Sequence, residues 1–255
     1  MSIGDRPELR ALIASRVPQL PFETIVGADA SRVILFGQRS EHVAFAGPEL
    51  GGMSRAMKAA GVRTFATPAP TDIVHRAGTV VMEGEARRIL DALALPAPHD
   101  AESWTDEASA QAAAIDSMRR SGLRIVELSQ STPDAHQPYR AWADEMSAAL
   151  DGGGPLVALL PQGAVDRSRE PRGDRASLTD RLEASGIEVT VVTFVGGRSA
   201  RPLSVTAVAA GMGLASETFA LDVRSQAWLP YTDYVVHLPQ FDIRATLDRG
   251  LGFDM

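Results

Sequence analysis

Short, nearly continuous apolar runs recur along this chain, and they constrain its fold more than any other feature. The clearest runs occupy residues 32–36, 156–160 and 187–195. A half-exposed strand alternates apolar and polar residues, whereas a strand of a parallel sheet is buried on both faces and is apolar throughout. Segments with helical periodicity separate the runs. The alternation predicts an α/β protein with a largely parallel sheet flanked by helices.

The expected elements follow from the same pattern. We expect strands at residues 32–36, 62–67, 78–82, 123–128, 156–160, 187–195, 203–209 and 231–238. We expect helices at residues 7–16, 49–60, 85–95, 103–120, 138–150, 177–186 and 214–223. Residues 37–48 and 161–176 are predicted to be polar loops. Trp142 and Met146 lie one helical turn apart, so both should face the core.

Capping signals set several helix boundaries. Ser103 with Asp106, and Ser177 with Asp180, have the spacing of a capping box at a helix N-terminus. Glycines follow three of the expected helices and are predicted to adopt the left-handed conformation that ends a helix. They are Gly61, Gly122 and Gly186.

The chain has 255 residues, enough for one large domain or two small lobes. One division places a first α/β lobe at residues 1–122 and a second at 123–255, as two related Rossmann-like lobes. A repeated pattern favours it, because a shift of 125 residues superposes Gly61 on Gly186 and residues 78–82 on 203–207. Every α/β protein repeats βαβ units of similar length, however, so one continuous domain without internal duplication stays open.

The composition excludes several classes of protein. The chain has no cysteine, which rules out disulfides, a cysteine nucleophile and cysteine metal ligands. Its first residues carry charges where a secretory signal needs an apolar core. No apolar run approaches the roughly 20 residues that cross a bilayer. We therefore expect a soluble, cytoplasmic protein with no membrane partner.

The charge of the chain bears on its partners. The formal net charge is −7, Lys58 is the only lysine, and arginines supply the other positive charges. An acidic chain binds the nucleic-acid backbone poorly, because such binding needs lysines and arginines that neutralise phosphates. We expect no nucleic-acid partner. Arginine suits two-point recognition of a carboxylate or a phosphate.

Three segments that follow expected strands combine glycine with arginine: residues 37–42, 162–169 and 196–201. Glycine lets backbone N–H groups approach an anion, and arginine supplies a forked set of donors. Because ligands of parallel sheets bind at the carboxyl ends of the strands, we predict a pocket for a small anionic molecule. Ordinary solvated turns are the alternative. The predicted binding residues are Arg39, Ser40, Gln162, Arg167, Arg198 and Ser199.

Known phosphate and nucleophile motifs are absent. No Gly-x-Gly-x-x-Gly follows a strand, and neither a P-loop nor a Gly-x-Ser-x-Gly elbow occurs. No two of the five histidines have a metal-ligand spacing, so the sequence predicts no metal and names no cofactor. His75 with Asp72 is the candidate acid–base pair, although a solvated loop would explain both residues.

The sequence leads to two functions. The first is an enzyme that acts on a small anionic metabolite bearing a phosphate or a carboxylate, bound by the glycine–arginine segments at the strand ends. The alternative is a noncatalytic binding or assembly subunit of a larger complex, favoured by the lack of a catalytic motif. Either protein could form a homo-oligomer.

Overall fold

The computed structural model describes residues 7–27, 33–38, 43–69, 87–88, 101–129, 138–151, 153–167, 176–196, 204–226 and 231–239. Within them the strands form one seven-stranded sheet in the order β3-β2-β4-β1-β5-β7-β6. Only the β6–β7 pair is antiparallel, and the other five pairs are parallel. The strands are β1 (Val33–Gln38), β2 (Thr64–Thr67), β3 (Arg124–Glu127), β4 (Leu156–Pro161), β5 (Val189–Gly196), β6 (Phe219–Asp222) and β7 (Tyr234–Leu238).

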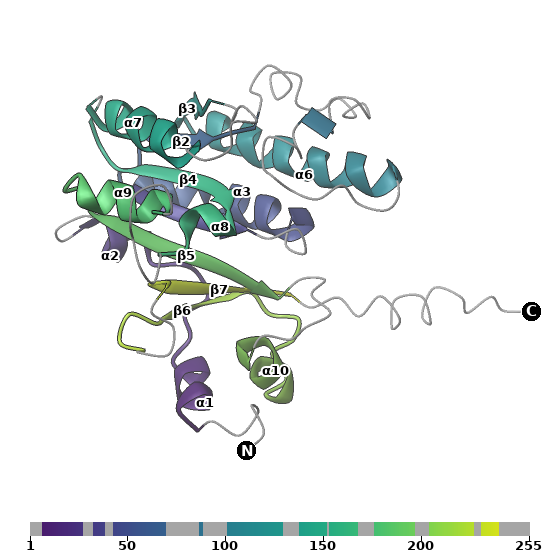
Figure 1. The fold of residues 1–255 in the computed structure, drawn as a ribbon. Coiled ribbons are helices and arrows are strands. Elements are labelled where there is room, and N and C mark those ends of the chain that lie inside the picture. The colour runs from purple at the N-terminus through teal and green to yellow at the C-terminus, as the bar shows by residue number, and fades with distance from the viewer. Residues whose placement is uncertain are drawn as a thin grey trace, which may run out of the picture.

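Helices cover both faces of the sheet (Figure 1). On one face, which we call face A, Phe36, Phe65 and Phe194 pack with helices α2, α3 and α6. On the other face, face B, Leu35 and Val191 pack with α7, α8 and α9, and a smaller cluster joins α1 and α10 to β5, β6 and β7. The helices are α1 (Pro7–Ala14), α2 (Phe22–Gly27), α3 (Val43–Ala59), α6 (Ala101–Arg120), α7 (Pro138–Asp151), α8 (Gln162–Val165), α9 (Leu178–Ala184) and α10 (Ser204–Gly211).

The predicted α/β class and parallel sheet are confirmed, and so are most of the local boundary signals. Ser177 and Asp180 form a complete capping box before α9, with the Ser177 N–H bonded to Asp180 Oδ2 at 2.8 Å. The three helix-ending glycines have φ of 95°, 82° and 77° for Gly61, Gly122 and Gly186. Trp142 and Met146 are buried in the face B core as expected.

Two predictions in the C-terminal third are wrong. The apolar run 203–209, predicted as a strand, lies almost wholly in helix α10, and the segment 214–223, predicted as a helix, contains strand β6. Both runs are short and apolar, and periodicity cannot tell a buried strand from a buried helix in such a run. Strand β6 is specified by its partner β7, with Phe219 opposite His237 in the register.

Three boundaries also differ from the prediction. Helix α3 begins at Val43, inside the predicted loop 37–48, and the four-residue helix α8 occupies the start of the predicted loop 161–176. Helix α6 begins at Ala101, so Ser103 lies within the helix and does not cap it. The predicted strand 78–82 and helix 85–95 fall outside the described residues, apart from Arg87 and Arg88, which are helical.

The two halves of the chain share the sheet, because β4 lies between β2 and β1. The proposed boundary after residue 122 falls between α6 and β3, and the division into two Rossmann-like lobes stays a prediction. The internal duplication loses one of its supports, because the predicted second-copy strand at residues 203–207 is part of α10.

Candidate functional site

Three neighbouring strands end at one edge of the sheet. Strands β4, β1 and β5 are adjacent and parallel, with Gln38 opposite Pro161 and Gly37 opposite Thr193. Their carboxyl ends therefore lie together, and each is followed by one of the predicted glycine–arginine segments. We call this place the carboxyl edge. Of the predicted site residues, the structure describes Gln162 and Arg167; Arg39, Ser40, Asp72, His75, Arg198 and Ser199 lie outside the described residues.

The chain leaves β1 and β4 toward opposite faces of the sheet. After β1 it continues into α3, whose Leu50 and Met53 pack on face A, and after β4 it continues into α8, whose Ala164 and Val165 pack on face B. Two adjacent strands whose following helices lie on opposite faces define a topological switch point. In open α/β sheets, ligands bind at such points, outside the carboxyl ends of the strands.

Gln162 is held at this edge on face B. Its side chain is buried at 6% exposure. Its Nε2 donates to Thr193 Oγ1 at 3.2 Å and also to the Asp166 carboxylate, while its Oε1 has no partner among the described residues. Gly37 of β1 faces this carboxamide, and a Cβ on Gly37 would lie 2.5 Å from Gln162 Oε1. The glycine is thus required for the carboxamide to lie against β1.

Gln38 occupies the same edge on face A. Successive side chains of a strand point to opposite faces, so Gln38 points away from the side where Gln162 lies. Its Oε1 accepts a hydrogen bond from Gln111 Nε2 of α6 at 3.1 Å, and its own Nε2 is buried without a partner among the described residues. The switch point is thus flanked by one unpaired carboxamide N–H₂ and one unpaired carboxamide oxygen. A buried polar group without a partner costs about 1–3 kcal/mol, so these two atoms mark positions where the described residues leave a polar group unsatisfied.

Arg167 lies elsewhere, at the amino end of β5. Its guanidinium pairs with Asp233 at 3.0 Å and Glu183 at 3.1 Å, and it donates to the Val189 carbonyl oxygen at 3.4 Å. Burial acts to lower the pKa of Arg167, but the hydrogen bonds and charges of Asp233 and Glu183 raise it overall. Asp233 also accepts from Val191 N–H at 2.8 Å, so the pair joins the start of β5 to the segment before β7. Arg167 therefore joins elements of the fold and is not at the carboxyl edge.

The sequence interpretation missed several residues of this edge. Gln38 could have been found, because it is the first polar side chain after a buried apolar run. Gln111 and Thr193 carry no such signal, since each reaches the edge only through the packing of α6 or the register of β5.

Within the described ranges no group of three or more carboxylate or imidazole side chains is arranged to hold a metal ion. None of the described helices has the length and apolar character needed to cross a membrane.

Comparison with known proteins identifies the fold. No family model matches the chain, and no curated protein matches it. Among solved structures, the type III effector HopBA1 is similar with a TM-score of 0.50 and 12% identity, over 89% of this chain and 96% of that one. The effector domain RRSP, from a MARTX toxin of Vibrio vulnificus CMCP6, gives a TM-score of 0.41 at 16% identity, over 73% of this chain and 37% of that one. A solved structure of bacterial protein toxins gives a TM-score of 0.40 at 17% identity, over 73% of this chain and 38% of that one. The likeness to HopBA1, at this identity, is one of fold.

Proposed function

We propose that the protein is an enzyme acting on a small anionic metabolite, with a phosphate or a carboxylate, bound at the carboxyl edge of β4, β1 and β5. The observation that carries the proposal is the switch point between β1 and β4, flanked by the unpaired Nε2 of Gln38 and the unpaired Oε1 of Gln162. The first is a hydrogen-bond donor that an anionic oxygen can use, and the second can accept from a ligand hydroxyl or amide.

The residues proposed to hold the anion are the arginines and serines that follow β1 and β5 in the sequence. They are Arg39, Ser40, Arg198 and Ser199, with Gln162 orienting the ligand from the end of β4. Asp72 and His75 remain the proposed acid–base pair. Arg167 leaves the proposed set, because its guanidinium already pairs with Asp233 and Glu183.

The proposal is tested by thermal unfolding of the chain with inorganic phosphate, sugar phosphates and dicarboxylates. A ligand present at a hundred times its Kd stabilises the folded state by about 2.7 kcal/mol. We expect one class of anion to raise the unfolding temperature, and Arg39→Gln and Arg198→Gln to remove that shift. Arg140→Gln is the matched control, because Arg140 is an exposed arginine of α7 and its loss changes the net charge equally. No response to any anion, or an equal loss in the control, contradicts the proposal.

The alternative, a noncatalytic binding or assembly subunit, makes a different prediction. It requires a defined complex in solution and a ligand that is bound but not converted. Measuring the molar mass of the protein, and following a stabilising ligand by NMR for chemical change, separates the two functions. We also propose that the protein is cytoplasmic and forms a homo-oligomer. The lack of cysteine fits the reducing conditions of the cytoplasm.

A further inference from the structure

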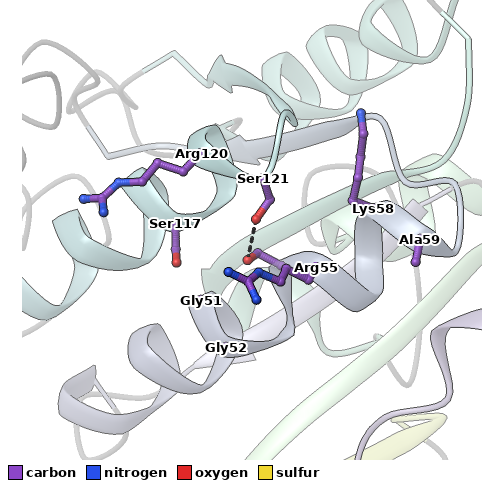
Figure 2. A pocket seen from close by; sticks show the side chains of 9 residues that line it. Gly51, Gly52, Arg55, Lys58, Ala59, Ser117, Arg120 and Ser121 are labelled. Atoms are coloured by element: carbon purple, nitrogen blue, oxygen red, sulfur yellow. Dashed lines mark hydrogen bonds between the residues drawn. The ribbon is translucent and has the colours of Figure 1, made fainter.

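A polar pocket of about 670 Å³ lies between the C-terminal halves of α3 and α6 (Figure 2). These helix ends lead into the amino ends of β2 and β3, so the pocket is remote from the carboxyl edge. Three basic side chains and three serines line it: Arg55, Lys58, Arg120, Ser54, Ser117 and Ser121. Its remaining walls are glycine and alanine.

The charge of this pocket is opposite to that of the chain. The chain carries −7 overall, yet each charged residue that lines the pocket is basic, and the single lysine is among them. Arg120 pairs with Asp116, one turn earlier on α6. Among the described residues no carboxylate pairs with Arg55. The pocket therefore offers a positive field that its own lining leaves largely uncompensated.

The basic groups keep donors for a ligand. Lys58 Nζ gives one hydrogen bond to the Gly122 carbonyl oxygen, at 2.9 Å, and an ammonium group has three N–H donors. Figure 2 shows Arg120 at one end of the pocket and Lys58 at the other, with Arg55 between them. Ser121 Oγ donates to Ser54 Oγ at 2.8 Å across the two helices. Cations spread over the length of the pocket suit a ligand with more than one negative charge.

Two adjacent glycines of α3, Gly51 and Gly52, line the pocket and differ in what surrounds them. A Cβ on Gly51 would lie 3.4 Å from Ala114 Cα, an ordinary contact distance, so position 51 faces helix α6. A Cβ on Gly52 would meet nothing within 4 Å. Glycine inside a helix costs about 1 kcal/mol relative to alanine, and no contact of the described residues requires that cost at Gly52. Its missing side chain instead leaves one wall of the pocket open.

We propose that this pocket binds a small soluble molecule through a phosphate or polyphosphate group. Guanidinium and ammonium groups together with serine hydroxyls form the donor set that phosphate oxygens use, and charge-assisted hydrogen bonds of this kind are roughly twice as strong as neutral ones. The pocket is separate from the carboxyl edge, so a ligand here need not contact the residues proposed to bind the anion at that edge.

The test is calorimetric titration of the full chain with inorganic pyrophosphate and, separately, with inorganic phosphate, at low ionic strength. We expect saturable binding of pyrophosphate, weakened at least about tenfold by Arg55→Gln, since a charge-assisted bond is lost. Arg140→Gln, the same change of charge on α7, should alter the affinity less than about twofold. Gly52→Leu should abolish binding, because the leucine side chain fills the pocket from a solvent-exposed position.

A folding control accompanies these variants. Gly52→Ala should raise the unfolding temperature, because alanine is the better helix former, and the Gly52→Leu variant should unfold no lower than the wild type. If Gly52→Leu stays folded and no longer binds pyrophosphate, the loss of binding is due to the leucine side chain filling the pocket and not to a damaged fold. The proposal is overturned if pyrophosphate does not bind at concentrations up to about 10 mM. It is equally overturned if Arg39→Gln removes the binding and Arg55→Gln leaves it unchanged, an outcome that would assign the anion to the carboxyl edge.

Discussion

Replacing Gly37 by alanine should displace the Gln162 carboxamide from the carboxyl edge. The new Cβ would lie 2.5 and 2.8 Å from Oε1 and Cδ of Gln162, which is too short for a real contact, and 3.0 Å from its Nε2, which is tighter than most real contacts. The three nearest atoms all belong to one side chain, so the side chain, not the strand, must move. Gly37 has no left-handed φ, and an alanine there meets no backbone strain.

The cost follows from the bonds that Gln162 would lose. Moving its carboxamide breaks the hydrogen bonds to the Asp166 carboxylate and to Thr193 Oγ1. A neutral hydrogen bond contributes about 0.5–1.5 kcal/mol and one to a charged group about 1.5–3 kcal/mol. Alanine in place of glycine recovers about 0.4–1 kcal/mol through the unfolded chain. We therefore expect Gly37→Ala to lower the free energy of unfolding by about 1–4 kcal/mol.

The informative measurement is the same substitution in a Gln162→Ala background. Without the carboxamide the clash is gone, and the alanine at position 37 should be neutral or stabilising by about 0.4–1 kcal/mol. Urea unfolding of the four proteins gives the coupling energy between the two positions. If Gly37→Ala costs as much with Gln162→Ala as without it, the two residues are uncoupled and the reasoning about this edge is refuted.

Three further predictions concern other parts of the structure. Gly196→Ala should lower the free energy of unfolding, measured in urea, by about 3 kcal/mol or more. The φ of Gly196 is +102°, and a Cβ there would lie 2.3 Å from the Leu238 carbonyl oxygen. A loss below about 1 kcal/mol, the scale of a tolerated change, would contradict this expectation. Ser177→Ala should cost about 1 kcal/mol by removing the α9 cap. Ser177→Thr keeps the hydroxyl that accepts from Asp180 N–H and donates to Asp180 Oδ2, so it should retain most of that stability when thermal unfolding is compared. His237 is buried, which lowers its pKa below 6.5 despite the hydrogen bond from the ring to the Glu217 carbonyl oxygen. The imidazole of His237 therefore binds a proton more readily in the unfolded chain than in the folded one. The folded state is most stable above pH 6.5, and its stability falls as the pH drops from 6.5 toward the lowered pKa. His237→Gln should flatten that part of the stability–pH curve, and an unchanged curve would show that another group titrates.

The features predicted correctly depend on neighbours in the sequence. The capping box of Ser177 and Asp180 spans four residues, and the burial of Trp142 and Met146 follows from one helical turn. A helix-ending glycine such as Gly186 needs only its own φ to be positive. These signals act within one element, so a linear pattern contains them.

The candidate site was predictable only in part. The apolar runs predicted a parallel sheet, and with it a candidate ligand site where the parallel strands end; the ligand itself stays a proposal. The adjacency of β1 to β4, which makes the switch point, could not be predicted, because β4 follows β1 by more than a hundred residues. The assignment of Arg167 to a ligand depended on its neighbours in the sequence, whereas Asp233 and Glu183, which hold its guanidinium, are 66 residues and 16 residues away in the chain.

The amino-acid sequence by itself determined the fold class of the protein. Its apolar runs are too continuous for half-exposed strands, so both faces of the sheet must be buried, and helices cover those faces. It also determined where several helices begin and end. Only the tertiary structure decided whether the apolar segments 203–209 and 214–223 form strand or helix, and which strand ends meet. The physical reason is that a short apolar segment is stabilised by burial in either conformation, and the choice is made by the hydrogen-bond partner and the packing surface that distant parts of the chain provide.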